Sequence, residues 1–89
     1  MLEDPAAAYE NQAKEALAGE NGVVIREEVA RFGREISKNI GWEREEVLER
    51  LVKAIADRRP SLFKFIPDDK DDRNAFAFAL YRAYTDSLQ

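Results

Sequence analysis

The sequence contains neither cysteine nor histidine. Without cysteine, the chain can form no disulfide and no thiolate metal site. Without histidine, it lacks the commonest acid–base catalyst and the commonest transition-metal ligand, and its serine and threonine hydroxyls have no imidazole to activate them. We therefore expect no enzymatic activity, no catalytic residues, no metal and no cofactor.

The sequence also lacks a long apolar run. The longest is AFAFALY, at 75–81, which is far short of the ~18 residues that a membrane-spanning helix needs. The stretch MLEDPAAAYE at the start is acidic and has no basic segment followed by an apolar one, so we expect no secretory signal. These features predict a cytoplasmic protein that does not enter a membrane.

Basic residues are too few to favour a nucleic-acid partner. The chain has 14 lysines and arginines against 18 acidic residues and a net charge of −4, whereas binding to a phosphate backbone needs clustered cations. Its 89 residues, 45% of them hydrophobic and 36% charged, suit one small folded domain. We expect a single helical domain over 1–89.

Helical periodicity begins near the start of the chain. Segment 4–18 has Asp4 as its expected N-cap and Pro5 at its first helical position. We expect Gly19 to end this helix in a left-handed conformation. The turn GENG, at 19–22, then leads to the next helix.

Segment 23–40 has the clearest helical pattern. Its apolar residues recur at steps of three and four and predict a single buried seam, formed by Ile25, Val29, Phe32, Ile36 and Ile40. Gly33 interrupts this helix at a cost of about 1 kcal/mol relative to alanine. We attribute this glycine to the close approach of a neighbouring helix.

Three more helical segments complete the predicted fold. The residues expected to face inward in segment 43–59 are Val47, Leu48, Leu51 and Ile55, and its expected ion pairs at four-residue spacing are Glu46–Arg50 and Glu49–Lys53. Segment 61–66 is a single turn or tight connector, and the last helix covers about 70–88. The prediction is an all-α fold: a compact bundle of four main helices plus one short helical element.

The acidic run DDKDDRN, at 68–74, does not fit a calcium-binding loop. An EF-hand loop needs glycine at its sixth position and glutamate at its twelfth. Counted from Asp68, these positions hold Arg73 and Ala79. An acidic start to the last helix, favoured by the helix dipole, is the better interpretation.

Aromatic residues are concentrated in the last third of the chain. On the last helix Phe76, Leu80 and Tyr84 form one stripe, whereas Phe78 and Tyr81 point away from it. A helix with two apolar faces is either surrounded by other helices or keeps one face for a partner. Phe63 and Phe65, in SLFKFI, add to this aromatic cluster.

The stretch NIGW, at 39–42, suggests two kinds of binding element. The spacing of Ser37, Gly41 and Val47 resembles that of a helix-turn-helix motif, which implies a DNA-binding regulator that uses residues 36–51. The reading helix would then start with Glu43, Glu45 and Glu46, which phosphate repels.

The same stretch is also similar to a loop of ubiquitin-associated domains. In that family a Met-Gly-Phe or Met-Gly-Tyr triplet joins the first two of three helices, and Ile40, Gly41 and Trp42 are similar to it. The resemblance implies that these residues contact an apolar patch on a partner. The sequence has no methionine here, and the family's third-helix pattern is not evident in RRPSLFKFI. The alternative is architectural: Gly41 caps a helix and Trp42 packs across the corner.

The function that remains is protein binding. We predict a non-catalytic interaction module, such as an adaptor, a regulatory subunit or a small inhibitor, whose partner is another protein. The predicted contact residues are Trp42, Phe63, Phe65, Phe78 and Tyr81. Self-association through the same surface is a further expectation, and DNA binding through residues 36–51 is the alternative function.

Overall fold

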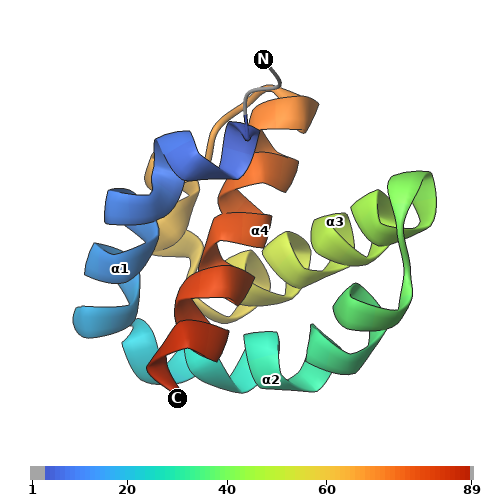
Figure 1. The fold of residues 1–89 in the computed structure, drawn as a ribbon. Coiled ribbons are helices and arrows are strands. Elements are labelled where there is room, and N and C mark those ends of the chain that lie inside the picture. The colour runs from blue at the N-terminus through green and yellow to red at the C-terminus, as the bar shows by residue number, and fades with distance from the viewer. Residues whose placement is uncertain (1–3, 89) are drawn as a thin grey trace.

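Six helical elements follow one another along the chain (Figure 1). The computed structural model describes residues 4–88, without the side chains of Phe63 and Phe65. The elements are the 3-10 helix η1 (Pro5–Tyr9), α1 (Glu10–Ala18), α2 (Gly22–Lys38), α3 (Gly41–Arg58), the 3-10 helix η2 (Pro60–Phe65) and α4 (Lys70–Ser87). The prediction of an all-α bundle with four main helices is confirmed. The expected short element at 61–66 corresponds to η2, and η1 is a second one.

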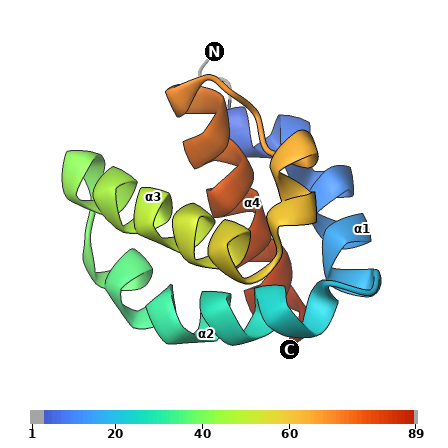
Figure 2. The ribbon, with the colours of Figure 1, turned by 180° about the vertical axis from the view of Figure 1, so that it is seen from behind.

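Helix α4 crosses the middle of the molecule, with α1 on one side and α3 on the other (Figures 1 and 2). It contacts η1, α1, α2 and α3. Its large buried side chains are Phe76 and Leu80, and small residues between and beside them let the neighbouring helices approach closely. These small residues are Ala75, Ala77, Ala79 and Ala83. The apolar run 75–81 is therefore helical, as predicted, and not a strand.

The first helical segment starts as predicted but is wound differently. The side chain of Asp4 caps η1 by accepting the Ala6 N–H at 3.1 Å, and Pro5 occupies the first helical position. Arg82 of α4 donates a hydrogen bond to the Asp4 carboxylate, and this bond lowers the pKa of Asp4. The first five residues of the segment form a 3-10 helix, and the α-helix begins only at Glu10.

The turn between α1 and α2 requires a glycine, but not at the predicted position. Gly19 has φ −81° and ψ −172°, so the predicted left-handed cap is wrong. The N–H of Gly22 donates to the Gly19 carbonyl at 3.0 Å, which folds the chain back on itself. A β-carbon at Gly22 would lie 2.1 Å from the Leu17 carbonyl oxygen. The requirement for glycine therefore comes from close backbone packing at Gly22.

The predicted apolar seam of α2 is buried except at its end. Ile25, Val29 and Ile36 are buried and Phe32 is half-buried, but Ile40 is 75% exposed. The reason is that α2 ends at Lys38, so Ile40 lies on extended backbone outside the helix. The inward residues of α3 are buried as predicted: Val47, Leu48, Leu51 and Ile55.

Charged side chains on α3 pair with other helices instead of with one another. Arg50 contacts Glu35 of α2 at 2.9 Å, and Glu49 contacts Arg73 of α4 at 3.7 Å. The predicted pairs Glu46–Arg50 and Glu49–Lys53 are therefore wrong, because a neighbouring helix presents an opposite charge to one member of each.

In the described part of the chain, no helix is both long enough and apolar enough to cross a membrane.

Candidate functional site

The corner between α2 and α3 reverses the chain in a few residues. The N–H of Asn39 and its side-chain Nδ2 both donate to the Glu35 carbonyl, at 3.1 and 2.9 Å, and so cap the end of α2. Ile40 is extended, with φ −132° and ψ 165°. Gly41 has φ 63°, which L-residues rarely adopt, and is the first residue of α3. Gly41 therefore lies in the turn, but the prediction that it caps a helix is wrong, because Asn39 caps α2.

Arg44 holds this corner against the rest of the protein. Its Nε donates to the carbonyl oxygen of Ile36 at 3.3 Å, which is among the last carbonyls of α2, and to that of the cap residue Asn39 at 2.9 Å. Its guanidinium lies 4.9 Å from the centre of the Phe78 ring, a distance suited to a cation–π contact. The corner is therefore tied both to the end of α2 and to α4.

The apolar side chains of the corner point into solvent. Ile40 is 75% exposed and Trp42 is 67% exposed, and they are two of the four large exposed hydrophobic residues in the described part of the chain. The expectation that Trp42 packs across the corner is therefore wrong. Arg44 takes the inward position, and Trp42 lies roughly 200° around the helix from it. We refer to Ile40, Gly41 and Trp42 as the corner patch.

Phe78 and Tyr81, which were also predicted as contact residues, are half-buried. Their rings stack with centroids 5.9 Å apart, and Arg44 and Arg82 lie 4.9 and 5.9 Å from the Phe78 centroid. A β-carbon on Gly33 would lie 3.8 Å from the Tyr81 ring, which is an ordinary van der Waals distance, so the close approach expected at that glycine is not found. These aromatics form a second packed face of α4. The side chains of Phe63 and Phe65 lie outside the described residues.

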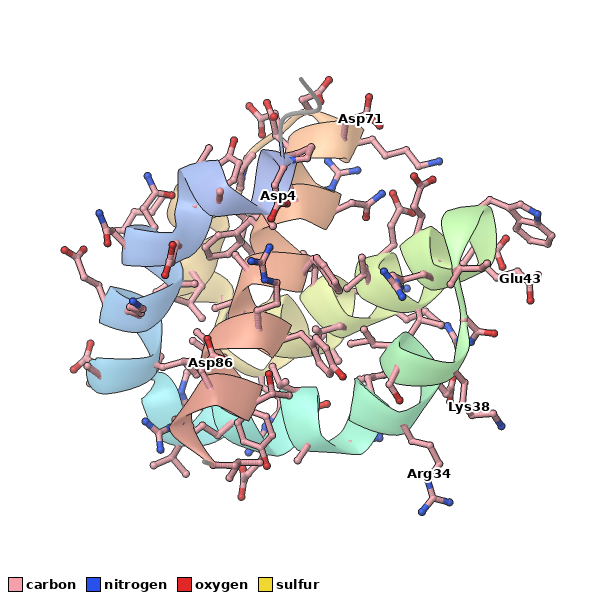
Figure 3. All side chains as sticks on the ribbon, in the orientation of Figure 1. Asp4, Arg34, Lys38, Glu43, Asp71 and Asp86 are labelled. Carbon is pink, nitrogen blue, oxygen red and sulfur yellow. The ribbon has the colours of Figure 1, made fainter. Side chains whose placement is uncertain are left out.

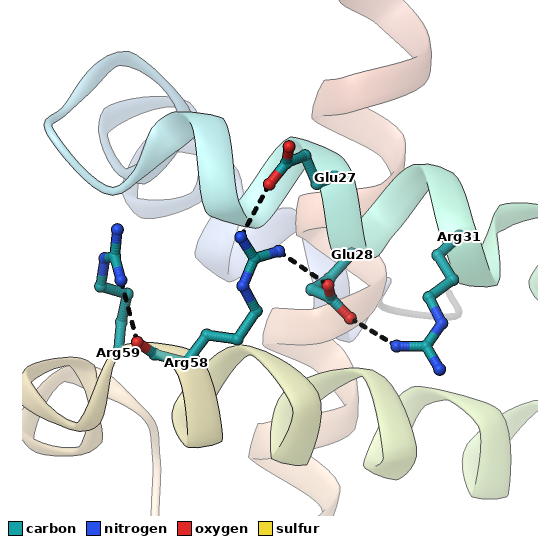
Figure 4. Close-up of polar contacts among 5 residues, drawn as sticks. All are labelled: Glu27, Glu28, Arg31, Arg58 and Arg59. Atoms are coloured by element: carbon teal, nitrogen blue, oxygen red, sulfur yellow. Dashed lines mark hydrogen bonds and ion pairs between the residues drawn. The ribbon is translucent and has the colours of Figure 1, made fainter.

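A buried carboxylate lies at the other end of the α2–α3 pair. Glu28 is 5% exposed and accepts hydrogen bonds from Arg58 at 2.9 Å and Arg31 at 3.3 Å (Figure 4). Arg58 also contacts Glu27 at 2.8 Å, and its bonds to both glutamates raise the pKa of Arg58. Charge partners therefore satisfy Glu28, and we assign it to the joining of the two helices.

The arrangement of α2 and α3 does not favour the helix-turn-helix alternative. Their ion pairs join Glu35 to Arg50 and Glu27 to Arg58, so the two helices run antiparallel. Figure 4 shows the second of these pairs. A helix-turn-helix instead crosses its helices at about 90–120°. Val47 is buried. In addition, the exposed start of α3 carries acidic side chains: Glu43, Glu45 and Glu46.

The acidic run 68–74 begins α4, as predicted. The side chain of Asp69 accepts the Asp72 N–H at 3.1 Å and caps the helix. Within residues 4–88, no group of three or more acidic side chains is placed to hold a metal ion. Asn74, which the sequence did not single out, is buried in the first turns of α4, and its amide has no hydrogen-bond partner there.

Two surface grooves lie along the helices, and Glu46 near the start of α3 lines the first of them. One, of about 660 Å³, has Val52, Ala56, Ile66 and Pro67 among its lining residues. The other, of about 640 Å³, lies among α1, η2, α3 and α4. The corner patch differs from both grooves in presenting the large exposed apolar side chains Ile40 and Trp42.

No protein-family profile matches the chain, and neither a curated protein nor a solved structure is significantly similar to it. Functional conclusions therefore depend on the arrangement of its own side chains. In that arrangement, the corner patch combines exposed apolar surface with a fixed backbone.

Proposed function

We propose that the chain is a non-catalytic, cytoplasmic protein-binding module that contacts its partner through the corner patch. One observation carries the proposal: Ile40 and Trp42, on either side of Gly41, are 75% and 67% exposed. Tryptophan is among the residues that most often dominate binding energy at protein interfaces. An adaptor, a regulatory subunit or a small inhibitor would all use such a surface.

The rigidity of the corner supports this proposal. Binding costs less when the contact residues are already held in place. Arg44 donates a hydrogen bond to Asn39, which caps α2, and its guanidinium contacts the Phe78 ring of α4. These contacts hold the backbone beside Trp42 in place. In this proposal Phe78 and Tyr81 support the contact surface, and Trp42 makes the contact.

Site-specific photo-crosslinking in cells tests the proposal. Trp42 is replaced by p-benzoylphenylalanine, which forms a covalent bond to any protein that touches it on irradiation. We expect discrete adducts from position 42. Val23 is 70% exposed and lies at the opposite end of α2, so the same replacement there is the matched control.

A second substitution ties the adducts to the apolar surface. Adding Ile40→Asp to the crosslinking chain should reduce the adduct yield, because it places a charge in the contact. If position 42 gives no adduct, or the same adducts as position 23, the corner patch is not a binding surface.

A further inference from the structure

We propose that the partner at the corner patch is a second copy of this chain, related to the first by a two-fold axis. This inference rests on the proposed function and names its partner. The argument comes from the charges on either side of the patch. These charges have opposite signs, and in the described part of the chain none of them has an ion-pair partner.

The side of the patch toward α2 is basic. Arg34 and Lys38 lie four residues apart on α2, so they share a face of the helix. Figure 3 shows both side chains extending outward from the last turns of α2, away from the body of the protein. We call these two residues the basic edge.

The side of the patch toward α3 is acidic. Glu45 and Glu46 follow Trp42 by three and four residues and therefore lie on the same helix face as its indole. Glu43, also exposed, extends outward from the start of α3 (Figure 3). We call these three glutamates the acidic edge.

The charges that face each other across α2 and α3 are paired, unlike those of the two edges. Farther along the same helices, Arg50 pairs with Glu35, and Arg58 pairs with Glu27 and Glu28. Charges that could join the two helices are thus used, whereas those beside Ile40 and Trp42 remain available to a partner.

A two-fold axis through the patch matches these edges. In such an interface the same surface occurs on both copies, so a contact from one edge to the other is made twice. A rotation of 180° lays the basic edge of one copy over the acidic edge of the other, with both Trp42 side chains at the centre. A partner with charge of only one sign would be repelled by one of the two edges. A second copy carries both signs in the required order.

The dimer should be weak. The apolar surface comes from two side chains on each copy, and the charged edges lie at the rim, where ion pairs contribute little. Interfaces that bury less than about 1,200 Å² in total are typical of transient complexes. We expect a Kd on the order of 10 µM to 1 mM.

Sedimentation equilibrium of the purified chain tests the proposal. The wild type should shift from monomer toward dimer as its concentration rises to about 1 mM. Trp42→Ala should weaken the dimer by about tenfold or more, because it removes the central contact of the interface. Val23→Ala, which removes exposed apolar surface elsewhere, should leave the dimer unchanged.

A charge-swap experiment tests the two-fold arrangement. The variant R34E/K38E has two acidic edges. In the variant E45K/E46K both edges carry a net positive charge, although Glu43 remains. Each alone should dimerise about tenfold more weakly than the wild type, because like charges face each other. Their equimolar mixture should recover to within about threefold of the wild type, because every edge then meets its opposite. Trp42→Ala in both variants should abolish this recovery.

Circular dichroism first establishes that the variants are folded. If a charge reversal unfolds the chain, the neutral variants R34Q/K38Q and E45Q/E46Q take its place. Each should weaken the dimer by about threefold, and roughly 0.5 M NaCl should weaken the wild-type dimer in the same way. A dimer that is unaffected by these neutral changes contradicts the role of the edges.

The possible failures can be distinguished. A wild type that stays monomeric throughout, or a charge-swapped mixture no tighter than either variant alone, overturns self-association. If crosslinking at position 42 then still gives an adduct with a different protein, the proposed binding function stands without the dimer. If crosslinking also gives no adduct, both proposals fail.

Discussion

The turns on either side of α2 both contain glycine, but they need it for different reasons. In the turn at 19–22, Gly22 is buried, and a β-carbon there would lie 2.1 Å from the Leu17 carbonyl oxygen. In the turn at 39–42, Gly41 is exposed, has φ 63°, and has nothing within 4 Å of its β-carbon position. Glycine thus permits close packing in the first turn and an unusual backbone conformation in the second.

The side chains of the two turns differ as well. The first turn presents Glu20 and Asn21, polar residues that are common in connections between helices. The second turn presents Ile40 and Trp42, whose exposure to water is unfavourable in free energy. The first turn therefore presents polar side chains, whereas the second exposes large apolar ones.

The largest effect on the free energy of unfolding should come from adding a methyl group at Gly22, in the first turn. Gly22→Ala would force apart the backbones of α1 and α2, and we expect a loss of about 2–4 kcal/mol in the free energy of unfolding. Urea denaturation followed by circular dichroism measures this loss. Gly19→Ala is the control, because its β-carbon would lie 3.4 Å from the nearest atom. Equal effects at the two glycines would contradict the close packing at Gly22.

Substitution of Gly41, in the second turn, should lower the free energy of unfolding by a smaller amount. Gly41→Ala places a side chain on a left-handed backbone, which costs about 1–2 kcal/mol although space is available. Gly41→Asn should cost less than Gly41→Ala, because asparagine tolerates this conformation better. The same denaturation measurement applies. If asparagine is no better than alanine, the left-handed backbone is not the source of the cost.

Each turn is followed by an arginine that donates to a carbonyl of the preceding helix. Arg44 donates to Ile36 of α2 at 3.3 Å and to Asn39 of the turn at 2.9 Å, and it also contacts Phe78, whereas Arg26 has only the Leu17 carbonyl, at 3.5 Å. We expect Arg44→Ala to lower the free energy of unfolding by about 1–2 kcal/mol and Arg26→Ala by less than about 0.5 kcal/mol. Thermal denaturation of the two variants side by side checks this order, and the reverse order would refute the bracing role of Arg44.

The smallest effect on stability should come from the corner patch itself. Trp42→Ala removes a side chain that is 67% exposed, so the free energy of unfolding should change by no more than about 0.5 kcal/mol. Self-association, measured by sedimentation equilibrium, should nevertheless weaken by about tenfold or more. A loss of stability above about 1.5 kcal/mol would mean that the indole packs against the protein.

The helices could be predicted from the sequence because their apolar spacing and end signals are local. The seam residues Val29 and Ile36 of α2 and the cap at Asp4 were found in this way. The requirement for glycine at Gly22, in the first turn, could not be predicted from the sequence. Gly19 occupied the expected position after a helix, but the close contact at Gly22 depends on how α2 folds back, which no local pattern specifies.

The candidate site could be predicted only in part. The sequence singled out Trp42, but its exposure depends on the direction in which α3 leaves the corner. Phe78 and Tyr81 could be placed on a second face of α4, yet Phe78 is covered by Arg44, which lies distant in the sequence. The charge edges were also missed, because an unpaired charge can be recognised only after the paired ones are known.

Trp42 is the only tryptophan in the chain, and its exposure has an optical consequence. Its fluorescence in the folded protein should already resemble that of an indole in water, so unfolding should shift its emission very little. The partly buried tyrosines Tyr9, Tyr81 and Tyr84 should report loss of the fold in its place. The emission of Trp42 should therefore change when a partner covers the corner patch, and should change little when the protein unfolds.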